Sequence, residues 1–186
     1  MTVISDFEPQ YRLDVEWPTD ESASLGNTLD PEKLQDAPTV SLAGPLFIDG
    51  TSLAGMTHVL AVTDPDAPSR DNPKWSEFCH WIASGLTVPG ADTTTGGKAV
   101  PEHVIMSYKP PGPPPGTGKH RYVFLVLVPR NSTTDALHLT KPSGRQRWGY
   151  DEKGRGVRDW ADENGLIPVG KLKYFDYQRF RHEPRD

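Results

Sequence analysis

The chain has 186 residues, and its 20 Lys and Arg residues against 25 Asp and Glu residues give a formal net charge of −5. A chain of this length buries roughly 70% of its unfolded surface, which is enough for one hydrophobic core without disulfides or metals. We therefore expect a single domain spanning residues 1–186. The negative charge, and the lack of any long run of Lys and Arg, argue against a nucleic-acid surface.

The cysteine content and the N-terminal sequence point to the cytoplasm. Cys79 is the only cysteine, which excludes an intramolecular disulfide and fits a reducing compartment. Residues 1–30 contain no apolar stretch of signal-peptide length, and no run approaches the length of a membrane span. We expect a soluble cytoplasmic protein without stable membrane insertion. The glycosylation-like motif at Asn131 is then interpreted as an ordinary turn.

The secondary-structure elements that the sequence predicts are mostly strands. A single helical turn is predicted at residues 30–34, because Asp30 can cap it and Pro31 suits the first helical position. A helix is predicted at residues 156–164, where apolar side chains recur at helical spacing and Gly165 follows as a stop. Strands are predicted where short apolar runs rich in β-branched and aromatic residues end at turn residues, namely 40–42, 57–62, 75–82, 104–108, 122–128 and 165–175.

Two of these runs carry further information. Residues 75–82 fit either period, and we favour a strand because aromatic side chains would crowd both faces. Residues 122–128 are apolar without interruption, which predicts a strand inside a sheet with both faces covered. Because strands outnumber helices heavily, the sequence predicts a mainly β protein, an antiparallel β-sandwich with a few short peripheral helices.

Two motifs about fifty residues apart, residues 62–70 and 116–122, each join a strand-like run to a loop rich in Pro or Gly. Pro65 and Pro68 prevent regular strand pairing, so the chain must leave the sheet after Thr63. In an extended segment Asp64 and Asp66 point to the same side, two residues apart. Loop tips on a rigid sheet are where proteins position polar groups for a ligand.

These motifs, with His80, predict a pocket for a small anion. A carboxylate beside a neutral imidazole fixes its tautomer and leaves the other ring nitrogen for a ligand. His80, His120 and Tyr122 could then bond phosphate oxygens, with the amides of residues 116–118 as a backbone nest. An ammonium group on the same ligand would meet Asp64 or Asp66. We expect anion binding to strengthen as the pH falls through the histidine range, because imidazolium adds charge.

Most other polar residues have a structural interpretation. We expect Arg121 to bridge a carboxylate such as Asp66 and so lock the loop. His58 and His103 are interpreted as ordinary strand-end residues, and His138 and His182 as surface residues.

The sequence argues against a P-loop, a zinc site and a catalytic nucleophile. Residues 112–119 do not form a P-loop, because the glycine spacing is wrong and a strand follows instead of a helix. A zinc site would draw on Asp64, His80 and His120, but it lacks the usual ligand spacings. Cys79, in an aromatic strand, is expected to be a small buried hydrophobe. Ser69 or Ser76 beside His80 lacks a nucleophile elbow. We predict no catalytic residue, no metal and no cofactor.

The segments at residues 64–68 and 118–122 resemble the two signature motifs of the phosphatidylethanolamine-binding protein family. The likeness extends through residues 60–70, 75–80, 112–118 and 122–128. Residues 25–33, 147–150 and 156–166 resemble the fungal branch, which includes inhibitors of the vacuolar serine carboxypeptidase, carboxypeptidase Y. In scattered blocks the resemblance covers nearly the whole chain from Phe7.

The resemblance implies an antiparallel sandwich with a small anion pocket near one end, and a regulatory or inhibitory role instead of catalysis. The partners implied are an anionic small molecule or a phosphatidylethanolamine headgroup, and a serine carboxypeptidase or a kinase or Ras-pathway protein. It also implies a cis Ala67–Pro68 bond and a candidate cis Ser76–Glu77 bond. The ligand-binding residues are Asp64, His80, Pro114, His120 and Tyr122, with Phe78 and Gly112 on the rim and Asp66 close by, and Pro68 and Arg121 give structural support. Phe78 stands where many relatives have tryptophan.

Two other functions stay open: a lipid headgroup carrier, and a small metal-dependent hydrolase using Asp64, His80 and His120. The fungal inhibitors usually carry a longer helical lead, whereas residues 1–6 are nearly all that precedes the sandwich here. If that lead does the inhibiting, protease inhibition is absent. The chain also stops soon after the late strand, which is expected to leave the pocket more open than in animal relatives.

Overall fold

The computed structural model describes residues 3, 12–24, 26–43, 47–48, 51–53, 55–86, 98–99 and 101–177. The expectations about the lead before Phe7, about His182 and about the end of the chain lie outside these residues. Within the described ranges, no helix combines the length and apolar character needed to cross a membrane.

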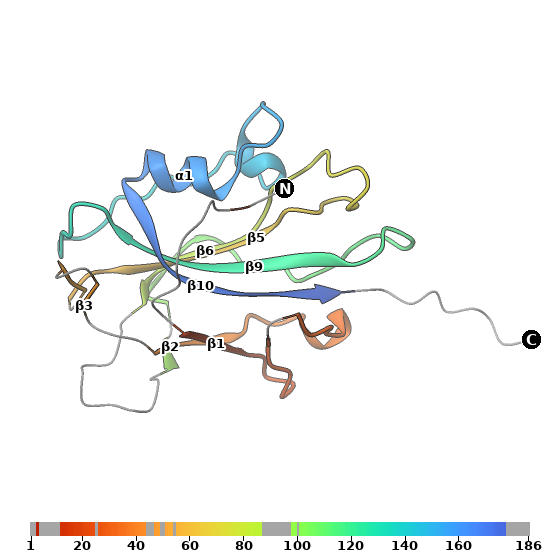
Figure 1. The fold of residues 1–186 in the computed structure, drawn as a ribbon, viewed down its shortest axis with the longest axis horizontal. Helices are drawn as coiled ribbons and strands as arrows, with labels where there is room; N and C mark the ends of the chain where they lie inside the picture. The colour runs from red at the N-terminus through yellow and green to blue at the C-terminus, as the bar shows by residue number, and fades with distance from the viewer. Residues whose placement is uncertain are drawn as a thin grey trace, which may run out of the picture.

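Two antiparallel sheets form the sandwich (Figure 1). The larger sheet has the strand order β10-β9-β5-β6-β8, and the smaller has the order β1-β2-β7. In Figure 1 the strands β1 and β2 lie below β9 and β10, while α1 (Val157–Glu163) lies above the larger sheet. The strands are β1 (Arg12–Glu16), β2 (Thr39–Ala43), β3 (Phe47–Ile48), β4 (Thr51–Ser52), β5 (His58–Asp64), β6 (Phe78–Leu86), β7 (Lys98–Ala99), β8 (His103–Met106), β9 (His120–Pro129) and β10 (Leu166–Tyr177), and the 3-10 turns are η1 (Pro31–Lys33) and η2 (Gln146–Gly149). The predicted mainly β sandwich is confirmed.

The larger sheet separates two hydrophobic cores, because successive side chains of a strand point to opposite faces. In β5, Val59 and Ala61 belong to the core under α1, whereas Leu60 and Val62 belong to the core facing the smaller sheet. Strand β9 alternates in the same way and lies between β10 and β5. The uninterrupted apolar run at residues 122–128 is therefore an interior strand covered on both faces, as predicted.

Two strands of the smaller sheet, β1 and β7, were missed, and so were the short strands β3 and β4. In β1, Leu13 and Val15 are buried, while Asp14 and Glu16 are more exposed, and Trp17 is buried just after the strand. This period of two is typical of a half-buried strand. The other expected elements are confirmed, including a strand within residues 75–82, the turn at η1 and the helix α1.

A buried ion pair joins the loop after β5 to the start of β9. The Asp66 carboxylate accepts hydrogen bonds from Arg121 Nε at 3.0 Å, from Arg121 Nη2 at 2.7 Å and from the Arg121 backbone N–H at 2.9 Å. Burial by itself would raise the pKa of Asp66, but these bonds hold it below its ordinary value of 3.8. Asp66 is 2% exposed. Arg121 thus bridges the Asp66 carboxylate, and the Ala67–Pro68 bond that follows Asp66 is cis.

A second buried carboxylate, Glu77, connects the start of β6 to α1. The Ser76–Glu77 bond is cis, as the resemblance implied. The carboxylate accepts the Val157 N–H at 3.1 Å and lies 3.2 Å from Thr63 Oγ1. A Cβ atom at Gly156 would lie 2.5 Å from the Glu77 carboxyl carbon, so glycine is needed there for close approach. Burial raises the pKa of Glu77 to about 7.

The change Arg121→Met is expected to lower the free energy of unfolding by about 2–4 kcal/mol, because it leaves the Asp66 carboxylate buried with fewer partners. Urea unfolding near neutral pH measures the loss. Arg130→Met is the matched control: it removes an Arg–Asp pair whose two side chains are 57% and 62% exposed, and is expected to cost at most about 1 kcal/mol. Equal losses in the two variants would contradict a structural role for the buried pair.

The change Glu77→Gln is expected to alter how stability depends on pH. Because the folded-state pKa lies above the ordinary value of 4.5, the stability contributed by protonated Glu77 is complete below that value and is lost as the pH rises through about 7. The wild type should therefore lose stability relative to Glu77→Gln across this window, by at most about 3 kcal/mol. Urea unfolding of both proteins across the window measures it. Glu152→Gln, at an exposed position, is the control, and parallel wild-type and Glu77→Gln curves would refute the expectation.

Candidate functional site

Three strands of the larger sheet place polar residues at one end of the sandwich. Strand β5 ends at Asp64, β6 begins at Phe78, and β9 begins at His120. The register pairs Asp64 with Phe78, and Thr63 with Val123. Because these strands are antiparallel neighbours, the two distant motifs and His80 meet at one edge. Figure 1 shows the loop before β9 and the turn η1 at this same end.

A cavity of about 1100 Å³ lies at this end. Its floor includes Asp64, His80, His120 and Tyr122. One wall is formed by residues 109–115, which are mostly proline, and another comes from residues 28–32 and Gln35 around η1. The volume is well above what an inorganic anion needs and slightly exceeds the range of about 300–1,000 Å³ that is usual for pockets of organic ligands.

Asp64 and His120 form a buried pair, 2% and 1% exposed. His120 Nδ1 lies 2.8 Å from Asp64 Oδ2, so Nδ1 carries a proton and donates it to the carboxylate. The other carboxylate oxygen accepts the Asp66 N–H at 2.7 Å. His120 Nε2 lies 3.1 Å from Thr117 Oγ1, and this hydroxyl lies 2.8 Å from the Pro114 carbonyl. The pair therefore fixes the imidazole and links it to the loop that walls the cavity.

His80 is held in one tautomer. Its Nδ1 lies 2.7 Å from the Lys109 carbonyl, which can only accept, so Nδ1 is the protonated nitrogen. The ring is 5% exposed, with the Phe78 and Tyr122 rings each 5.0 Å away, centroid to centroid. Burial lowers the pKa of His80 to about 4, against the opposing effect of Asp64. His80 therefore stays neutral as the pH falls through the usual histidine range. Its protonation does not strengthen anion binding there, contrary to our expectation.

Most of the predicted ligand-binding residues line the cavity, together with Pro68, which was expected only to give structural support. Those that line it are Asp64, Phe78, His80, Gly112, Pro114, His120 and Tyr122. Asp66 does not. Asp64 and Asp66 bind the consecutive residues His120 and Arg121, whose side chains leave β9 on opposite faces. The expectation that the two aspartates point to the same side was wrong, because the Asp66 N–H turns back onto Asp64.

The glycine-loop amides are also placed differently from the prediction. Residues 116–118 do not line the cavity, so the expected backbone nest is not part of it. The wall around η1 was missed altogether, although it brings Asp30 and Glu32 to the cavity. Tyr108, whose hydroxyl donates to the Leu34 carbonyl at 2.9 Å, helps hold this segment beside the loop. No local sequence pattern links residues 28–35 to the two motifs, because the contact is long-range.

Other candidate residues have structural surroundings. Cys79 is fully buried, and burial raises the pKa of its thiol to about 12, which confirms it as a buried hydrophobe. His58 and His103 begin β5 and β8, and His138 is exposed, as predicted. In the part of the chain that the structure describes, no three or more His, Cys, Asp or Glu side chains are grouped to hold a metal ion.

Comparison with known proteins identifies the family. The family model for phosphatidylethanolamine-binding proteins matches residues 19–170. The chain is 38% identical over 172 residues to an uncharacterized protein of Saccharomyces cerevisiae, covering 90% of this chain and 82% of that protein. It is 32% identical over 189 residues to the carboxypeptidase Y inhibitor of the same yeast, covering 92% and 86%.

Solved structures agree with these sequence matches. The carboxypeptidase Y inhibitor in complex with its cognate proteinase has a TM-score of 0.80 at 30% identity, covering 94% of this chain and 86% of that one. A phosphatidylethanolamine-binding protein from Plasmodium vivax shares the fold, with a TM-score of 0.70 at 17% identity over 96% and 90% of the two chains. The matched family model, the yeast relatives matched over 82% and 86% of their length and the shared sandwich together show that this chain belongs to the phosphatidylethanolamine-binding protein family.

Proposed function

We propose that this protein is a non-catalytic binding and regulatory protein that inhibits or modulates a protease, foremost a serine carboxypeptidase, while its cavity takes a phosphate-type group or a phospholipid headgroup. The observation that carries the proposal is the similarity to the carboxypeptidase Y inhibitor along 92% of the chain, with a TM-score of 0.80. A signalling enzyme, such as a kinase or Ras-pathway protein, is the other class of partner. We place the protein in the cytoplasm, because a chain with a single cysteine forms no intramolecular disulfide and needs no oxidising compartment.

The cavity supports the second half of the proposal. Two motifs that are distant in sequence converge on it, and the Asp64–His120 pair holds its floor rigidly. Lys109 and the Tyr122 hydroxyl bring groups that can donate hydrogen bonds to phosphate oxygens. The volume of about 1100 Å³ leaves room for the organic part of a headgroup. This room is the observation that favours a headgroup carrier as the alternative function.

One group of contacts resembles the catalytic triad of an enzyme. Asp64, His120 and Thr117 contact one another in the order of a carboxylate–imidazole–hydroxyl triad. However, the Thr117 hydroxyl also lies 2.8 Å from the Pro114 carbonyl, to which it can donate its proton. Thr117 does not line the cavity, so the hydroxyl is not presented to a ligand there. We interpret the chain of contacts as a loop anchor.

The inhibitory function predicts stoichiometric loss of peptidase activity when the purified protein is titrated into yeast carboxypeptidase Y. The reason is that an inhibitor that forms a tight one-to-one complex removes one enzyme molecule for each inhibitor molecule added. Residual activity against inhibitor concentration, measured with a peptide substrate, gives the affinity. If activity is unchanged at a large excess of the protein, this enzyme is not its target, and the proposal for a carboxypeptidase partner fails.

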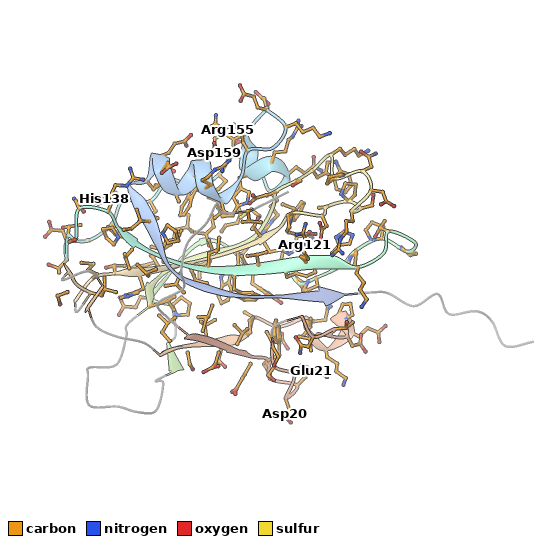
Figure 2. All side chains as sticks on the ribbon, viewed as in Figure 1. Asp20, Glu21, Arg121, His138, Arg155 and Asp159 are labelled. Carbon is orange, nitrogen blue, oxygen red and sulfur yellow. The ribbon has the colours of Figure 1, made fainter. Side chains whose placement is uncertain are left out.

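The cavity function predicts that His120→Ala weakens binding of both inorganic phosphate and phosphoethanolamine. The change removes the imidazole that holds Asp64 in the cavity floor, and the loss of a hydrogen bond to a charged group costs about 1.5–3 kcal/mol. Titration calorimetry measures the affinities. His138→Ala is the control, since Figure 2 shows His138 at the opposite end of the sheet from Arg121, the neighbour of His120. Unchanged affinity in His120→Ala would show that the two motifs are structural.

A further inference from the structure

The hydroxyl of Thr63, in strand β5, lies where three buried hydrogen bonds meet. The indole N–H of Trp148 donates to Thr63 Oγ1 at 2.9 Å. Two acceptors compete for the proton of this hydroxyl: Oε2 of Glu77 and the carbonyl oxygen of Phe78, each 3.2 Å from Oγ1. A threonine hydroxyl has one proton, so it can donate fully to only one of them. Thr63, Glu77 and Trp148 are each at most 3% exposed, so bulk water does not replace a missing partner.

The charge of Glu77 decides which acceptor receives the proton of Thr63. When Glu77 is ionised, Thr63 donates to it, because a charged acceptor makes the stronger hydrogen bond. When Glu77 is protonated, its carboxyl O–H can donate to Thr63 Oγ1 instead. Thr63 then accepts two hydrogen bonds, from Trp148 and from Glu77. Its own proton goes to the Phe78 carbonyl, so the donor and both lone pairs of the hydroxyl are all used.

We propose that Glu77 and Thr63 form a protonation switch that couples the start of α1 to the rim of the cavity. Besides Thr63, Glu77 Oε2 accepts the backbone N–H of Val157, the first residue of α1, at 3.1 Å. Phe78, whose carbonyl gains or loses the proton of Thr63, begins β6 and lines the cavity. The ionised form therefore holds the start of α1 with a charged acceptor. The protonated form weakens that contact and binds β5 to β6 at the rim through Thr63.

The surroundings of Glu77 let it take up this proton near neutral pH. Burial raises the pKa of Glu77 to about 7, against the hydrogen bonds that its carboxylate accepts. On α1, Arg158 lowers this pKa and Asp159 raises it, so these two charges oppose each other. From β5 and η2, Thr63 and Trp148 present neutral groups. Both protonation states of Glu77 are therefore populated in the folded protein near neutral pH.

Other titratable groups on β5 and β6 can be told apart from the switch. On β6, burial raises the pKa of the Cys79 thiol to about 12 and lowers the pKa of His80 to about 4. Neither residue changes its charge in the range where Glu77 does. At the end of β5, the Asp64 carboxylate is bound to His120 Nδ1 at 2.8 Å. The variant Glu77→Gln keeps this pair, so it separates the titration of the pair from that of Glu77.

NMR titration of the wild-type protein tests the switch without a protease or a cavity ligand. Three resonances should shift with a common midpoint near pH 7: the Phe78 carbonyl carbon, the Trp148 indole N–H and the Val157 backbone N–H. Glu77→Gln should abolish all three shifts. If the Val157 N–H titrates while the Phe78 carbonyl stays constant, Glu77 changes its charge without redirecting the proton of Thr63, and the inference is overturned. It is also overturned if none of the three resonances titrates in this range.

Two variants of Thr63 form a matched pair for a second test. Thr63→Val removes the hydroxyl and keeps the branched shape, whereas Thr63→Ser keeps the hydroxyl. In Thr63→Val the Val157 N–H should still titrate, with a higher midpoint because ionised Glu77 has lost a hydrogen bond. The Phe78 carbonyl should lose its pH dependence in this variant and retain it in Thr63→Ser.

Thermal unfolding shows whether each variant is folded, since Thr63→Val also leaves the Trp148 indole N–H without its acceptor. A folded Thr63→Val in which the Phe78 carbonyl titrates as in the wild type overturns the inference. If Thr63→Val does not fold, the comparison of the wild type, Thr63→Ser and Glu77→Gln still decides, because loss of the Phe78 shift in Thr63→Ser contradicts a relay through the hydroxyl. The proposed function is unaffected by either result.

Discussion

The geometry of the cavity depends on a single turn in which two carboxylates, two residues apart, bind two consecutive residues of another strand. Asp64 accepts from His120 and Asp66 from Arg121, which lie 56 and 55 positions further along the chain. The two contacts lie on opposite faces of β9, so the start of that strand is held from both sides. Because all four side chains are buried or partly buried, the imidazole is positioned before any ligand arrives, and binding pays little for ordering it.

The sheet behind this turn makes it stiff. Strand β5 lies between β9 and β6, and all of its side chains are buried, so the end of β5 cannot move without disturbing two close-packed cores. Just before β6, the buried carboxylate of Glu77 likewise connects two elements. It accepts the backbone N–H of Val157, the first residue of α1, and packs closely against Gly156. Buried carboxylates thus fix both strand ends that border the cavity. Burying a carboxylate is costly unless it is hydrogen-bonded, and here the partners are backbone N–H groups, the His120 imidazole, the Thr63 hydroxyl and the Arg121 guanidinium.

How far the sequence could predict this protein depends on the range of each interaction. Strands β5, β6 and β9 are buried on both faces, so their apolar runs are visible without knowledge of the fold. Strand β1 has charged residues at alternate positions, and its weaker pattern escaped notice. The two motifs, taken together with His80, led to the prediction that Asp64, His80 and His120 share one pocket. The direction of Asp66 is set by a local hydrogen bond to Asp64, and the wall around η1 by contacts across the fold, such as Tyr108 with Leu34. Neither leaves a periodic trace in the sequence.

For the proposed phosphate-type ligand, the charge of the protein constrains how the cavity can recognise it. With a net charge of −5 and carboxylates in the lining, long-range attraction does not draw anions in, so selection has to come from short-range hydrogen bonds. Hydrogen bonds are directional, and the tautomer of each imidazole is fixed here by a partner on its Nδ1 side. Such a site can distinguish ligands of equal charge by the positions of their hydrogen-bond donors and acceptors. A pocket of this kind suits a regulatory protein, since its occupancy follows the chemical form of a ligand as well as its concentration.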